Sequence, residues 1–106
     1  MNCNSSNLIY LITCKLCGLQ YIGETKRKLK DRLNDHISNI RTNKITAIAL
    51  HFKTLYHSIT HLQIIPIKLI NNNDKTIRLA KEKYWIQILK TTYPYGLNNY
   101  PIDKHY

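Results

Sequence analysis

The sequence predicts an α+β fold in which a small three-stranded antiparallel sheet is flanked by helices, in the order β-β-α-α-β-α. Two short β-forming runs near the start, residues 8–13 and 19–23, are joined by only five residues. Two segments with apolar residues at helical spacing follow, then a third β-forming run and a longer helical segment. Neighbouring strands with so short a connection can only be antiparallel, which excludes an all-parallel sheet.

The first two strands are predicted from their composition. Residues 8–13 are apolar and rich in β-branched and aromatic side chains, and residues 19–23 form a second, shorter run of the same kind. The intervening residues 14–18 contain Gly18 and suit a hairpin connection.

An amphipathic helix is predicted next, with Thr25 as its N-cap. Leu29, Leu33, Ile37 and Ile40 recur at helical spacing, and about four turns would place them on one face. After a polar break, residues 46–56 favour a second, shorter helix.

Residues 62–70 predict the third strand, and Pro66 places it at a sheet edge or at a bend, because proline cannot donate to the ladder. Residues 71–74 form a turn that ends in the N-cap Asp74, and residues 75–90 predict the last helix. This helix is apolar on two arcs and is therefore expected to pack into the body of the domain; the arcs are Ile77, Ala80, Tyr84, Ile88 and Trp85, Ile86, Leu89. The tail from residue 91 is expected to be irregular.

A chain of 106 residues supports one domain, expected to span residues 1–106 with its core at about 8–98. Its 16 Lys and Arg against 6 Asp and Glu give a formal net charge of +10. That balance favours a nucleic acid as partner, although an anionic membrane surface would also attract it. No apolar run approaches the roughly 20 residues of a membrane span, and the first residues do not resemble a signal peptide, so an intracellular location is expected.

Several polar residues could carry chemistry. Tyr10 and Tyr21 lie on neighbouring predicted strands and could face each other, although such pairs are more often packing elements. Arg32 and His36 are four residues apart, so they project from one helix face and combine a phosphate-binding fork with a group that exchanges protons near neutral pH. Glu82 lies mid-helix in partly apolar surroundings and would either pair with Arg78 or bind Mg²⁺.

Cys14 and Cys17 form a C-x-x-C pair on the predicted hairpin turn, and His51 and His57 follow. Two thiolates and two imidazoles match the ligand set of a structural Zn²⁺ site, with His61 as a spare candidate. The alternatives are a redox-active pair, whose usual βαβ context is missing, and cysteines and histidines that are unrelated to each other.

Five motifs follow one another along the chain: Leu8-Ile9-Tyr10, Tyr21-Ile22-Gly23, Arg32-x-x-x-His36, Glu82 and Gly96-Leu97-Asn98. In this order they resemble the motifs of the GIY-YIG nuclease superfamily, over about residues 8–98. Leu8 stands where that superfamily has its first Gly. The chain is more closely similar to the endonuclease domain of Penelope-like retroelements, on the strength of Cys14-x-x-Cys17 between the tyrosine motifs, Tyr21-Ile22-Gly23-Glu24-Thr25, His51-Phe52, His57-Ser58 and Glu82-Lys83-Tyr84-Trp85-Ile86.

The resemblance implies a GIY-YIG fold with an active site across the sheet and one Mg²⁺ or Mn²⁺ held by Glu82. Tyr10 or Tyr21 would act as general base toward an attacking water. Arg32 would stabilise the charge that develops on the phosphate, and His36 would orient or deprotonate the tyrosine pair.

The resemblance also implies that Asn98 anchors the phosphate or a neighbouring backbone, and that four basic residues follow the DNA backbone: Lys26, Arg27, Lys28 and Lys30. The expected activity is nicking of DNA to support retroelement integration by target-primed reverse transcription, in the nucleus, beside a reverse transcriptase domain and its RNA. The alternative is a zinc-stabilised nucleic-acid-binding module without catalysis.

Overall fold

The computed structural model describes residues 1–101, and it confirms the α+β class and the predicted order of elements. Three strands form one sheet in the order β2-β1-β3, and both pairings are antiparallel. The strands are β1 (Ser6–Cys14), β2 (Gln20–Lys28) and β3 (Leu62–Leu69). Both β2 and β3 are therefore edge strands.

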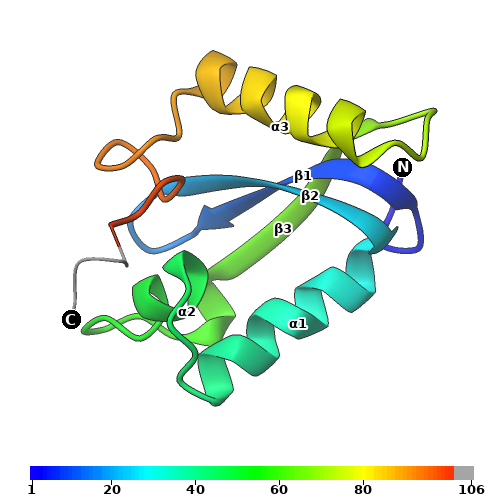
Figure 1. Ribbon diagram of the computed structural model, residues 1–106. Coiled ribbons are helices and arrows are strands. Elements are labelled where there is room, and N and C mark those ends of the chain that lie inside the picture. The colour runs from blue at the N-terminus through cyan, green and yellow to red at the C-terminus, as the bar shows by residue number, and fades with distance from the viewer. Residues whose placement is uncertain (102–106) are drawn as a thin grey trace.

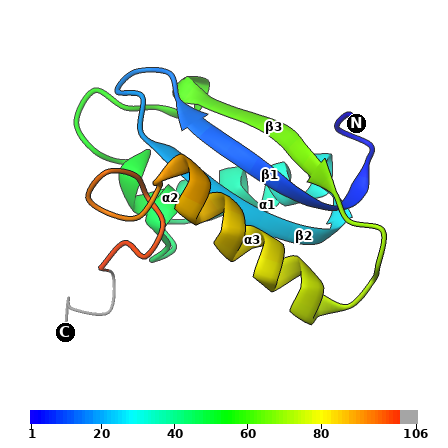
Figure 2. The same ribbon diagram turned by 90° about the horizontal axis from the view of Figure 1, so that it is seen from above.

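Helices cover both faces of the sheet. Helices α1 (Leu29–Arg41) and α2 (Ala47–His51) lie on one face, and α3 (Lys75–Leu89) crosses the other (Figures 1 and 2). A single 3₁₀ turn, η1 (Ile59–His61), leads into β3. Within residues 1–101 no helix has the length and apolarity needed to cross a bilayer.

The alternation of side chains along β1 builds a core on each face, because successive residues of a strand point to opposite sides. Leu8, Tyr10 and Ile12 are fully buried beneath α1 and α2. Ile9 and Leu11 point to the other face, where Ile77, Trp85 and Ile86 of α3 pack against the sheet. The middle strand is thus buried on both faces.

The boundary between β2 and α1 differs from the prediction. Residues 26–28 continue β2, so Thr25 is buried in the strand and does not cap the helix, whose N-cap position is Lys28. The register with β1 shifts between Ser6↔Lys28 and Leu8↔Thr25. This irregularity interrupts the alternation of buried and exposed residues that marks a strand in the sequence. Residues 26–28 were therefore assigned to the helix.

The prediction that Pro66 places β3 at a sheet edge or at a bend is confirmed. β3 is an edge strand, and its register with β1 shifts between Ile9↔Lys68 and Tyr10↔Pro66. The missing proline N–H is accommodated where the ladder is already interrupted.

Two helix predictions need correction. Helix α2 ends at His51, five residues short of the predicted end, and a turn in which Tyr56 has φ 67° follows. Helix α3 is not enclosed in the domain: Tyr84 and Ile88 are 53% and 52% exposed, and the inward face is formed by Ile77, Trp85 and Ile86.

Candidate active site and metal-binding cluster

Tyr10 and Tyr21 share the sheet face that α1 covers, but they are diagonal neighbours and not a directly opposed pair. Tyr10 pairs with Gly23, and Tyr21 pairs with Ile12. A Cβ at position 23 would collide with the Tyr10 ring, so Gly23 leaves the space that this ring occupies. Tyr10 is fully buried, whereas Tyr21 is half-buried.

Arg32 and His36 of α1 both reach the Tyr10 hydroxyl. The Arg32 Nε–H donates to it at 3.2 Å, and His36 Nε2 lies 2.8 Å from it. Because the hydroxyl oxygen already accepts from Arg32, we assign its proton to the bond with His36, which makes Nε2 the acceptor. The imidazole proton then sits on Nδ1, which is buried and has no partner among the described residues.

The protonation states agree with this assignment. Burial, followed by the positive charge of Arg32, lowers the pKa of His36 to about 4, so the imidazole is neutral at physiological pH. Burial raises the pKa of Tyr10 and of Tyr21, with Tyr21 adding to the shift at Tyr10 and Glu82 to the shift at Tyr21. Both phenols therefore keep their protons in the free protein.

Glu82 comes from α3, on the opposite side of the sheet, and meets the α1 residues at the edge formed by β2. There a cleft of about 380 Å³ opens, and its walls include four of the predicted site residues besides Glu82: Tyr21, Arg32, His36 and Asn98. Burial and the nearby charge of Glu24 raise the pKa of Glu82 to about 6. Tyr10 lies beneath this cleft and does not line it.

The predicted alternative, a pair between Glu82 and Arg78, is wrong. Arg78 is 5% exposed, and its Nε donates to Glu24 Oε2 at 2.9 Å, while its Nη1 donates to Asn7 Oδ1 and to the Asn73 carbonyl. Glu82 has no Lys or Arg within ion-pair distance in the described part of the chain. An unpaired carboxylate in a cleft fits the oxygen-ligand chemistry of Mg²⁺ or Mn²⁺.

Asn98 binds a neighbouring backbone. Its Oδ1 accepts from the Ile22 N–H at 2.8 Å, and its Nδ2 donates to the Ile22 carbonyl at 2.8 Å, so the amide pairs with the free edge of β2 as another strand would. The Thr91 hydroxyl donates to the same Oδ1 at 2.6 Å. Thr91 was not singled out from the sequence, which carries no local signal for this contact.

The four basic residues predicted to follow DNA are all exposed, but they lie on two elements. Lys26, Arg27 and Lys28 are at the end of β2, and Lys30 is in the first turn of α1. The Arg27 Nη1 donates to Asp35 at 2.8 Å.

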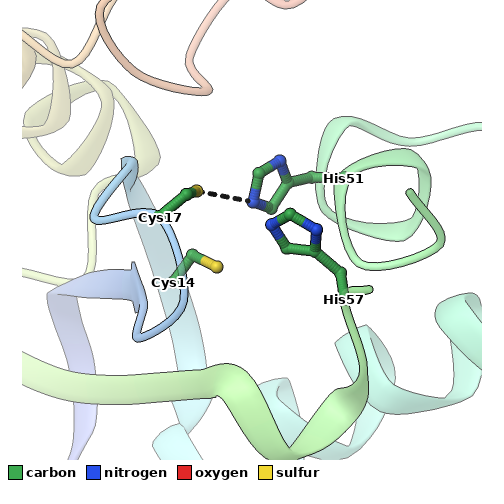
Figure 3. A group of neighbouring side chains, drawn as sticks. All are labelled: Cys14, Cys17, His51 and His57. Atoms are coloured by element: carbon green, nitrogen blue, oxygen red, sulfur yellow. Dashed lines mark hydrogen bonds between the residues drawn. The ribbon is translucent and has the colours of Figure 1, made fainter. Parts of the chain in front are cut away.

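The second cluster joins the β1–β2 turn to α2 and the loop after it. Cys14, Cys17, His51 and His57 point toward one another (Figure 3), and one ligand atom from each lies within 4.8 Å of the others. We call this set the cysteine–histidine cluster. Within the cluster, Cys17 Sγ and His51 Nε2 are in hydrogen-bond contact at 3.5 Å. None of the three cysteines forms a disulfide.

The surroundings of His57 fit a metal ligand. The Thr54 hydroxyl donates to the His51 carbonyl, so it accepts from His57 Nδ1 at 2.9 Å, and the Leu55 carbonyl lies 3.2 Å from the same nitrogen. Both neighbours are acceptors, which places the proton on Nδ1 and a lone pair on Nε2. That Nε2 is buried and has no partner in residues 1–101.

Zn²⁺ bound by two thiolates and two imidazoles would hold its ligand atoms roughly 3.3–3.8 Å apart. Small side-chain movements would bring the cysteine–histidine cluster to that spacing. His61 is not a member of the cluster, and its Nδ1 accepts from the Ser58 N–H. Cys3 is exposed and is not a member either.

In a comparison with known families, the model of the GIY-YIG catalytic domain matches residues 6–95. No curated protein and no solved structure matches the chain.

Proposed function

The chain belongs to the family of GIY-YIG catalytic domains, and on that premise we propose that it is a divalent-metal-dependent DNA endonuclease that uses Glu82 as its metal ligand. Membership of the family makes it a nuclease domain, a hydrolase that acts on nucleic acid. The observation that carries the finer proposal is the cleft, where an unpaired carboxylate, a guanidinium and a phenol converge from three elements. A formal net charge of +10 suits a polyanionic substrate.

When bound at Glu82, Mg²⁺ or Mn²⁺ would polarise the scissile phosphate and stabilise the departing 3′-oxygen. The partly free guanidinium of Arg32, whose side chain is 31% exposed, would contact the non-bridging oxygens and stabilise the charge that builds there. A hydrogen bond from His36 Nδ1–H to a water or phosphate oxygen would satisfy the donor that is unpaired in the free protein.

The different burial of the two tyrosines favours a division of work between them. Tyr21 lines the cleft and is the phenol that can contact the attacking water; Tyr10 is enclosed and positions Arg32 and His36. Tyr21 must first release its own proton to solvent. As a phenolate it then takes a proton from the attacking water while the water oxygen bonds to phosphorus and the bond to the 3′-oxygen breaks, and the 3′-oxygen takes a proton from solvent. Since burial raises the pKa of Tyr21, this step needs the positive charge of Arg32 and of the metal to favour the phenolate.

Incubation with supercoiled plasmid tests the proposal. Nicking should require Mg²⁺ or Mn²⁺, and it should be abolished in Glu82→Ala while the far-ultraviolet circular dichroism and DNA binding of that variant persist. DNA binding without cleavage under either metal would instead support a binding module without catalysis.

We further propose a structural Zn²⁺ in the cysteine–histidine cluster and, with the similarity to Penelope-like elements, a role in target-primed integration in the nucleus, next to a reverse transcriptase. The cluster supports this, since its two cysteines lie between the two tyrosine motifs. Priming requires a free 3′-hydroxyl, so a DNA polymerase should extend the nicked product directly. A product that needs phosphatase treatment before extension would exclude that role.

A further inference from the structure

A second groove of about 380 Å³ opens beside the cleft, between the end of β2, the first turns of α1 and the start of α3. These three segments lie together on one side of the molecule (Figure 1). The groove walls carry five cationic side chains and two carboxylates. We call it the basic groove.

Both carboxylates in the basic groove are already paired. Glu24 accepts from Arg78, and Asp35 accepts from Arg27 at 2.8 Å. Lys26 on β2 and Lys75 on α3 are exposed, and neither has a carboxylate within ion-pair distance in the described residues. The five cations and two carboxylates leave a net charge of +3, and Asp35 is shared by Arg27 and Arg32. Two of the unpaired charges are the ammonium groups of Lys26 and Lys75, on different elements, and they attract an anion.

The basic groove adjoins the cleft, because Arg32 lines both. Lys75 precedes Glu82 by seven residues on α3, which is about two helical turns, so both project from the same face roughly 10 Å apart along the axis.

We propose that the basic groove is a second phosphate-binding site, and that Lys75 contacts a DNA phosphate other than the scissile one. This inference rests on the proposed nuclease function and adds a contact that fixes the orientation of the cut strand. The groove walls contain no aromatic side chain on which a base could stack, so the contact is independent of sequence. Lys75 was not among the DNA-binding residues expected from the sequence.

Binding of a fluorescently labelled short duplex, measured by anisotropy from 50 to 200 mM salt with Ca²⁺ in place of Mg²⁺, tests the contact. Lys75→Ala should reduce the slope of log affinity against log salt by about one. The loss of affinity between 50 and 200 mM salt should therefore be about 3.5-fold smaller for this variant than for the wild type. Lys75→Arg should retain the wild-type slope. Lys81→Ala is the matched control, because Lys81 is exposed on the same helix but lines a different surface, toward β3.

Equal slopes for Lys75→Ala and Lys81→Ala would overturn the site, whatever the nicking activity. Steady-state nicking gives an independent readout: Lys75→Ala should raise KM and leave kcat unchanged, and a loss confined to kcat would also overturn it. If the wild type binds DNA but does not nick it, the proposed function fails, and the salt slopes still decide on the second phosphate site.

Discussion

The cysteine–histidine cluster and the group formed by Tyr10, Arg32 and His36 each contain one buried histidine nitrogen that has no partner among residues 1–101, but the two nitrogens are of opposite kinds. At His36 the unpaired atom is a donor, Nδ1–H, on a side chain that lines the cleft. At His57 it is a lone pair on Nε2, beside two thiols. A buried donor is satisfied by a water or an anion, and a buried lone pair among thiolates by a cation. The comparison supports the proposals of substrate chemistry at the group that contains His36 and of structural metal binding at the cysteine–histidine cluster.

Removing the thiol ligands should have the largest effect on stability. In Cys14→Ser combined with Cys17→Ser, bound zinc should fall from about one per chain to none, with loss of about 3 kcal/mol or more of unfolding free energy and a drop in Tm of roughly 10 °C or more. Metal analysis and thermal unfolding measure both. Cys3→Ser is the control, since Cys3 is exposed and outside the cluster. A purified wild type without metal would remove the distinction between the clusters.

The guanidinium of Arg32 should matter for rate and little for folding. Arg32→Ala should slow plasmid nicking by about 10²–10³-fold, because a charged donor to the phosphate is lost. Arg27→Ala is a matched control: Arg27 binds the same Asp35 but is exposed at the end of β2, and nicking at saturating DNA should change little. Comparable rate losses in the two variants would mean that Arg32 acts only through general electrostatics.

The neutral state of His36 predicts a pH dependence of stability. Its pKa is lowered to about 4 in the folded protein, so between the unfolded value of about 6.5 and 4 the unfolded chain binds a proton that the folded chain does not. The unfolding free energy should therefore decrease as the pH is lowered from 6.5 to 4, by about 1.4 kcal/mol per pH unit from this group. Urea titrations at several pH values between 4 and 6.5 should show that the unfolding free energy depends more steeply on pH in the wild type than in His36→Gln. The same pH dependence in both proteins would contradict the assignment.

Asn98 should contribute to stability as well as to the cleft. Asn98→Ala leaves the N–H and the carbonyl of Ile22 unpaired at the β2 edge and should cost about 1–2 kcal/mol. Asn71→Ala, at an exposed turn position, should leave the urea midpoint unchanged. An unaltered midpoint in Asn98→Ala would mean that water replaces the amide at this edge.

The fold could be predicted from the sequence because its signals are local. Strand composition and helical spacing predicted the element order, and Pro66 predicted that β3 lies at a sheet edge or at a bend. The end of β2 was missed, since the register shift near Thr25 breaks the alternation that marks a strand. The exposure of Tyr84 and Ile88 was missed too, because apolar spacing alone does not tell which arc of a helix meets the sheet.

The arrangement of the site was harder to predict than the fold, because it depends on contacts between residues that are distant in sequence. The order of motifs identified the candidate residues, but not which tyrosine is enclosed, because that is decided by the packing of α1 over Tyr10. Helical spacing suggested Arg78 as the partner of Glu82, whereas Arg78 binds Glu24, which is 54 residues away. The four members of the cysteine–histidine cluster were predicted as a group from the C-x-x-C spacing and the histidines that follow it, and the structure brings them together.

The most direct test of the central claim is plasmid nicking by Glu82→Gln, measured with Mn²⁺ at a temperature where circular dichroism shows that the variant is folded. Glutamine keeps the shape of the side chain and removes the charge that would hold the metal. We predict native-like Tm and DNA binding with no detectable nicking. Nicking at the wild-type rate would contradict the assignment of Glu82 as the catalytic metal ligand.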